Sequence, residues 1–306
     1  MKLRIAFVLI CGAAFIACTL EAQDVQNRKA AAVADGPPNL LLVVHQELQG
    51  SKMAERQKLE ISMSRAADRL DAPNFWIEME SMTGPRDVVF FEPFDSFEHL
   101  EQAMFDWTKF CNAHPEVAHI QQELDGVVPG ERTASAIRRD DLSYAPQPVD
   151  FSKARYVRIQ EVRLFPGHGE DFTQAIKLLI DIRTAIKLES PFVVYEVNAG
   201  LPAPTFFIVS PMVTLAEDDN PLTWRANLEE SEAAPWLENL SQIARDSYSS
   251  SESNLYVIHP EVSHVPKEFV AGDPNYWRPS NKPETKPRSE VAPGGTPTKK
   301  GAYEKP

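Results

Sequence analysis

The sequence PNFWIE at residues 73–78 is answered by PFVVYE at residues 191–196, and FFEPF at 90–94 is answered by IVSPM at 208–212. Both pairs are separated by 118 positions. A third pair, DLSYAP at 141–146 and EVSHVP at 261–266, has nearly the same offset. Three matches at one spacing indicate that the chain contains an internal duplication, which has to be recognised before a fold is assigned.

Each half has the same order of predicted elements: strand, helix, strand, strand, helix, strand. Apolar residues recur with a period of two in the predicted strands and at helical spacing in the predicted helices. In the first half the strands are expected over 40–47, 75–80, 88–92 and 132–138, with helices over 51–70 and from a cap at Asp95 to Cys111. In the second half the strands are expected over 155–164, 192–197, 205–209 and 254–259, with helices over 169–188 and 236–247.

This order is the ferredoxin-like βαββαβ pattern, in which the helices cover one face of the sheet. The other face is expected to carry Trp76, Val194 and alternate residues of 40–44. Those apolar side chains need a cover, and packing one half against the other supplies it. We therefore predict an α+β protein whose two tandem repeats, residues 39–146 and 155–266, pack sheet to sheet as an intramolecular α+β barrel. A monomer with an internal pseudo-dimer is favoured, and the sequence leaves the oligomeric state open.

The predicted arrangement resembles the dimeric α+β barrel superfamily, which includes antibiotic-biosynthesis-type monooxygenases. The resemblance covers residues 39–266 and rests on the order of the elements and on the duplication. It implies a small-molecule pocket in or beside the barrel. The superfamily contains cofactor-free oxygenases, haem-handling enzymes, isomerases and proteins of unknown activity, so the resemblance selects no cofactor.

The two ends of the chain read as segments outside the repeats. Residues 1–22, with Lys2 and Arg4 before an apolar run over 5–16, are typical of a signal peptide, followed by a linker over 23–38. Export to the periplasm or beyond is expected, with a lipoprotein anchored through Cys18 as the alternative. A joint is expected over 147–154. Residues 267–306, rich in Pro and Lys, are expected to form a disordered tail whose removal from Asp273 onwards hardly changes stability.

The chain of 306 residues carries a net charge of −13. An acidic body argues against nucleic acid and anionic membranes as partners. No segment after the signal region is apolar enough to predict a transmembrane helix. A small-molecule ligand is the expected partner.

The candidate catalytic residues are His45, Glu78 and Glu196. His45 shares a predicted strand face with Glu47, which could orient it as a base, although a structural histidine is the commoner outcome. Glu78 and Glu196 are equivalent in the two repeats and are expected on the sheet–sheet face, where two nearby carboxylates could act as acid and base. The alternative is that both lie at strand ends, paired with Arg158 or Arg163.

Trp76, Glu47 and Val194 are the candidate ligand contacts. The sequences HPEVAH at 114–119 and HPEVSH at 259–264 look like a repeated metal motif, but a spacing of five points the two rings in different directions on a helix. No metal site is therefore predicted. The sequence favours an exported small-molecule-binding or structural module of the envelope; the alternative is a cofactor-free or haem-using enzyme.

Overall fold

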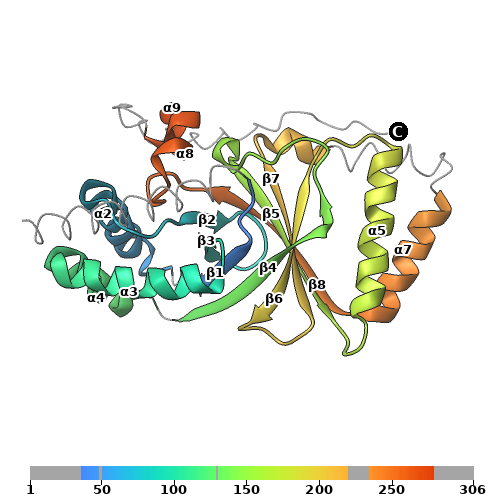
Figure 1. The fold of residues 1–306 in the computed structure, drawn as a ribbon, viewed down its shortest axis with the longest axis horizontal. Helices are drawn as coiled ribbons and strands as arrows, with labels where there is room; N and C mark the ends of the chain where they lie inside the picture. Colours follow the sequence, from blue (N-terminus) through green and yellow to red (C-terminus); the bar gives the residue numbers. More distant parts are fainter. Residues whose placement is uncertain (1–35, 48–49, 129, 220–233, 279–306) are drawn as a thin grey trace, which may run out of the picture.

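The computed structural model describes residues 36–47, 50–128, 130–219 and 234–278 (Figure 1). The expectations for the signal peptide, for most of the linker and for residues 279–306 lie outside these described residues.

Eight antiparallel strands form one closed barrel in the order β1-β3-β2-β8-β5-β7-β6-β4. The strands are β1 (Leu40–Glu47), β2 (Ile77–Ser81), β3 (Asp87–Phe94), β4 (Glu131–Tyr144), β5 (Tyr156–Leu164), β6 (Phe192–Ala199), β7 (Thr205–Met212) and β8 (Tyr248–Ile258). Each half contributes four consecutive strands of the barrel. The predicted α+β architecture, two ferredoxin-like repeats joined as an intramolecular barrel, is confirmed.

Two seams join the halves, and both use the last strand of a repeat. β8 pairs with β2 through Met79 and Ile258, and β4 pairs with β6 through Ile137 and Glu196. The halves are thus hydrogen-bonded edge to edge as well as packed face to face. Closure leaves neither half with an exposed sheet edge, which would otherwise invite aggregation.

The barrel interior is an apolar core whose members alternate along every strand. Met79, Phe91, Tyr195 and Phe207 belong to it and are almost fully buried. Trp76 and Val194 point outward instead, to the helices. This reverses the predicted face assignment. Both faces of these strands are apolar, so alternation alone did not mark the inner one.

Helices cover the outside of the barrel in two groups (Figure 1). The first half carries α2 (Met53–Leu70), α3 (Phe97–Ala113) and α4 (Pro115–Val127), and the second carries α5 (Gly169–Ala185) and α7 (Ala234–Ser247). The cap of α3 is Ser96, whose side chain accepts a hydrogen bond from the backbone N–H of His99, and not Asp95 as predicted.

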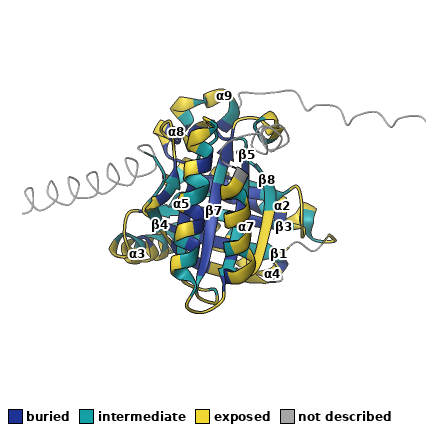
Figure 2. Cartoon of the chain, turned by 90° about the vertical axis from the view of Figure 1, so that its right-hand side faces the viewer, coloured by how far each residue is buried: buried dark blue, intermediate teal, exposed yellow. Residues whose placement is uncertain are grey.

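In the described part of the second half, apolar side chains pack between the sheet and its helices. Phe172 of α5 stacks on Phe206 of β7 with ring centroids 4.0 Å apart. Phe192 and Val194 of β6 complete this core and are buried. Figure 2 shows β7 as a buried strand behind α5 and α7.

One end of the barrel is closed by short helical segments: η1 (Phe151–Lys153), α8 (Lys267–Gly272) and α9 (Pro274–Trp277). A further short segment, η2 (Leu215–Asp219), follows β7. Trp277 is fully buried against Phe269, and its indole N–H donates to the carbonyl of Ser152 at 2.8 Å. The predicted tail boundary at residue 267 is therefore wrong, because residues as far as Trp277 complete the core. Among the described residues, no helix is both long and apolar enough to cross a membrane.

Replacing Trp277 by Ala should lower the free energy of unfolding by about 3–5 kcal/mol, the usual cost of emptying a buried aromatic site. A chain truncated after Arg278 keeps Trp277 and is the matched control; it should unfold at nearly the same urea concentration as the parent, because residues 279–306 are poor in apolar side chains. Equal urea midpoints for Trp277→Ala and the parent would show that the capping segment contributes nothing.

Candidate functional site

His45 points into the barrel. Leu41 and Val43 on the same strand belong to the interior core, and side chains two residues apart on a strand share a face. Its Nδ1 lies 3.3 Å from the carboxylate of Asp87, which extends from the adjacent strand β3. The predicted partner Glu47 is exposed at the end of β1. The carboxylate beside His45 therefore comes from the neighbouring strand. The sequence alone does not show which strands are neighbours.

Other polar side chains reach across the same end of the lumen. The hydroxyl of Tyr256 on β8 shares a hydrogen bond with Asp87, and burial together with that carboxylate raises the pKa of this phenol. Arg132 on β4 lies 4.0 Å from Glu161 on β5, a strand on the opposite side of the barrel.

The other end of the lumen holds an apolar cavity of about 30 Å³ lined by Leu41 and other core residues, room for little more than one water. Polar contacts thus bridge the lumen at one end. At the other end, which the short helical segments cap, the cavity is too small for an organic ligand.

Glu78 and Glu196 do not form the predicted pair. They lie on β2 and β6, on opposite sides of the barrel, and both point outward. Glu78 is buried and accepts a hydrogen bond from Arg56 of α2 at 3.3 Å, whereas Glu196 is 45% exposed and pairs with Arg139 at 2.6 Å. The alternative partners Arg158 and Arg163 pair instead with Asp218 and Glu161.

A wide opening with aromatic walls lies between the sheet of the first half and its helices. This cleft has a volume of about 560 Å³. Its sheet side carries Val44, Trp76 and Phe90, and its helix side carries Met63 and Trp107. A concave site of this size with aromatic walls and a few polar groups is the usual form of a small-molecule site. Of the predicted ligand contacts, Trp76 lines this cleft, while Val194 is buried in the core of the second half.

Glu92 is the most chemically informative residue of the cleft. It lies on β3, between the buried Phe91 and the half-buried Pro93, and its side chain faces the cleft. Burial, together with the negative charge of Glu131, raises the pKa of Glu92 to about 7. A carboxyl group that titrates near neutral pH in a cleft is a mark of a functional site. Sequence reasoning missed it, although a lone glutamate within the apolar stretch FFEPF was the available signal.

A second carboxylate group lies at the edge of the cleft. Glu60 of α2 and Glu78 share one guanidinium, that of Arg56, at 2.6 and 3.3 Å. Burial and the neighbouring Glu78 carboxylate hold the pKa of Glu60 well above its ordinary value. The physical reason is that two buried carboxylates beside a single cation cannot both ionise at low cost.

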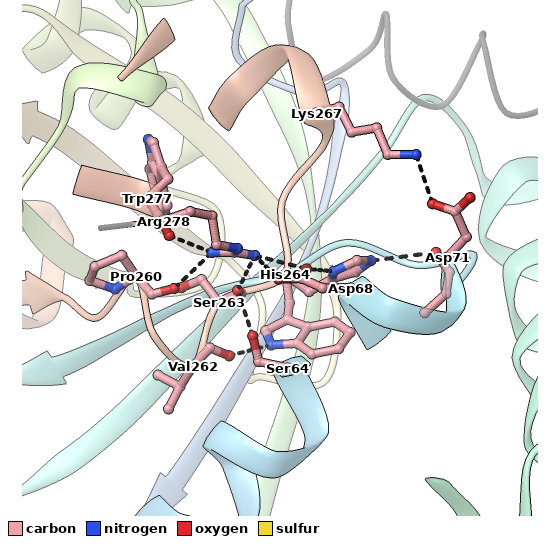
Figure 3. A network of polar contacts seen from close by, with 12 residues as sticks. Ser64, Asp68, Asp71, Pro260, Val262, Ser263, His264, Lys267, Trp277 and Arg278 are labelled. Carbon is pink, nitrogen blue, oxygen red and sulfur yellow. Dashed lines mark hydrogen bonds and ion pairs between the residues drawn. The ribbon is translucent and has the colours of Figure 1, made fainter. Parts of the chain in front are cut away.

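The position of Trp76 is fixed by a network that joins α2 to the C-terminal segment (Figure 3). The indole N–H of Trp76 donates to the carbonyl of Val262 at 2.8 Å, and its backbone pairs with His264. His264 in turn contacts Asp68 at 2.6 Å, and Arg278 pairs with the same carboxylate. Burial raises the pKa of Asp68, but the hydrogen bonds from His264 and Arg278 outweigh it and lower that pKa overall. The wall of the cleft is thus held by residues far apart in the sequence.

The repeated histidine motifs serve such structural contacts. His259 pairs with Glu261 at 3.3 Å, and His264 pairs with Asp68. Within the described parts of the chain, no group of three or more His, Cys, Asp or Glu side chains is arranged to hold a metal ion.

Haem, which the superfamily resemblance allows, does not fit the cleft. Its described lining contains neither a His, Cys or Tyr that could bind the iron nor a Lys or Arg that could pair with the propionates. Its titratable lining residues are all acidic: Glu60, Glu92, Asp125 and Glu131. Two carboxylates of a haem would be repelled there.

The closed barrel of two βαββαβ halves matches the predicted resemblance to the dimeric α+β barrel superfamily at the level of the fold. No family model and no curated protein matches the sequence. Similar solved structures include an anthrone oxidase-like protein, 12% identical with a TM-score of 0.47, covering 74% of this chain and 94% of that one.

Two further solved structures have the same general likeness. A proposed monooxygenase of Fusobacterium nucleatum is 7% identical with a TM-score of 0.48, covering 72% of this chain and 91% of that one. The chlorite dismutase of Candidatus Nitrospira defluvii, in complex with imidazole, is 9% identical with a TM-score of 0.44, covering 73% and 92%. Such likenesses concern the fold, and the chemistry has to be read from the cleft itself.

Proposed function

We propose that the protein binds an apolar or aromatic small molecule in the cleft between the first-half sheet and helices α2, α3 and α4. The observation that carries the proposal is the cleft itself, with about 560 Å³ of space and walls that include Trp76, Phe90 and Trp107. A ligand of moderate size packed against the two indoles and the phenyl ring would bury much of its apolar surface. In the described part of the second half, Phe172 and Phe206 stack in the corresponding position between sheet and helix.

The neutral fluorophore N-phenyl-naphthylamine should bind with a rise and a blue shift in emission, which fluorescence titration would measure. Met63→Trp places a larger side chain in the cleft from α2, and Met104→Trp does so from the more exposed α3. Both variants should raise the dissociation constant of the fluorophore, by about tenfold or more for Met63→Trp. Met82→Trp places the same change on an exposed residue outside the cleft lining and is the matched control. Lack of binding by the parent, or unchanged binding by folded Met63→Trp, would contradict the proposal.

A second candidate function is acid–base catalysis without a cofactor, and Glu92 is the observation that favours it. A carboxylate with a pKa of about 7 inside an apolar cleft is a stronger base than one in water and is available at neutral pH. Glu92 would remove a proton from a bound molecule. No partner base is needed for a single proton transfer.

Ring opening of nitrobenzisoxazole, a probe for proton removal in apolar sites, would test this candidate by absorbance. Its kcat/KM should rise with pH through about 7, because only the ionised Glu92 accepts a proton, and Glu92→Gln should lose most of the rate. A rate that is flat with pH, or unaffected in Glu92→Gln, would leave binding as the sole function of the cleft.

We further propose that the protein acts outside the cytoplasm. Lys2, Arg4 and the apolar run over 5–16 support export, with Cys18 as the anchoring residue of a lipoprotein in the alternative case. N-terminal sequencing of the mature protein should find Gln23 as the first residue, or Cys18 with a blocked amino group if the protein is a lipoprotein. Cytoplasmic protein that still begins with Met1 would contradict the proposal.

A further inference from the structure

The cleft between the first-half sheet and its helices is acidic throughout its depth. Glu92 lies inside it, Glu60 beside the floor, and Asp125 and Glu131 are exposed at its rim. Among the described lining residues there is no Lys, Arg or His. The charge facing any molecule in the cleft is therefore negative.

Pairing within the protein neutralises only part of this charge. Arg56 offsets Glu60 and Glu78, as described above. Asp125 and Glu131 accept hydrogen bonds from the neutral amides of Gln121 and Gln46. No cation among the described residues pairs with Glu92. A mostly buried carboxylate without a counter-ion costs free energy, and a positively charged ligand would recover it.

The aromatic walls favour the same kind of ligand. Trp76 and Trp107 meet edge to face with centroids 6.2 Å apart, and Phe90 lies beside them on the sheet. The faces of such rings attract cations, indole most strongly, and cages of this composition suit ammonium groups. Arg56 already lies 5.8 Å from the centre of the Phe90 ring, which shows that the floor accommodates positive charge.

We propose that the ligand of this cleft is an organic cation, with an apolar or aromatic body packed against the aromatic wall formed by Trp76, Trp107 and Phe90 and a positively charged nitrogen directed at Glu92. The inference rests on the proposed binding function and adds the chemical class of the ligand. Anionic molecules of the same shape would be repelled by the carboxylates of Glu92, Asp125 and Glu131.

The test is a pair of probes of one shape that differ only in charge. Naphthylmethyl-trimethylammonium and its neutral carbon analogue, neopentylnaphthalene, would each displace N-phenyl-naphthylamine from the parent protein, followed by fluorescence. At pH 8 the cation should displace the fluorophore at about tenfold lower concentration than the neutral analogue, mainly because the ionised Glu92 attracts it, with a smaller contribution from the aromatic faces. In Glu92→Gln this preference should fall to about twofold or less.

The preference should also depend on pH. Glu92 is ionised above about pH 7, so the ratio of the two displacement concentrations should grow from pH 6 to pH 8 in the parent and stay nearly constant in Glu92→Gln. The other titratable groups facing the cleft are Glu60 of α2, Asp125 of α4 and Glu131 of β4. Glu170→Gln, on the exposed start of α5, changes the net charge equally and is the control for long-range effects.

Asp125→Asn at the exposed rim is a second variant that leaves the packing intact, and it should reduce the preference by about two- to threefold. Equal displacement by both probes would overturn the cation inference while leaving the binding function in place. Full cation preference in Glu92→Gln would overturn the role of Glu92. Failure of the fluorophore itself to bind the parent would overturn both proposals.

Discussion

Closure of the barrel is the constraint on which the rest of the structure depends. The last strand of each repeat pairs across to the other half, β4 with β6 and β8 with β2. The inner faces of all eight strands are thereby committed to one apolar core, bridged at one end by polar groups such as His45, Asp87 and Tyr256. The cleft proposed as the ligand site lies instead on the outer face, where helices pack on the sheet.

The two halves use that outer face differently. At positions equivalent by the 118-residue offset, the first half has Trp76 and Glu92 where the second has Val194 and Ser210. In the second half, Phe172 stacks on the sheet and closes the space. In the first, α2 carries Glu60 and Met63 over an open cleft. After duplication, close packing in one half can stabilise the barrel while looser packing in the other leaves room for the proposed ligand site. Such a division agrees with the general observation that functional sites cost stability.

The sequence predicted the duplication, the order of elements and the closed barrel, because these depend on hydrophobic periodicity and on the need to cover an apolar face. It did not predict which face of β2 and β6 is inside, since Trp76, Ile77 and Met79 are apolar on both sides of the strand. For the same reason Glu78 and Glu196 were expected to meet and do not. Trp277 was assigned to the tail, with Tyr276 as a pair that could pin the tail's start onto the domain; its full burial depends on a cap assembled from distant segments, with Phe269 and Ser152 as partners. His45 faces the barrel interior, and its carboxylate neighbour is Asp87 and not Glu47, because strand register sets that pairing and local sequence does not show it.

The claim that the ligand lies outside the lumen can be tested directly by ¹⁹F NMR of protein labelled with fluorotryptophan. Trp76 and Trp107 line the cleft, whereas Trp277 closes the barrel end. Each resonance can be assigned by a Trp→Phe variant. Addition of the naphthylmethyl-trimethylammonium probe should shift the Trp76 and Trp107 resonances and leave Trp277 unchanged. A shift of Trp277 with Trp76 and Trp107 unmoved would place the ligand in the barrel and contradict the account.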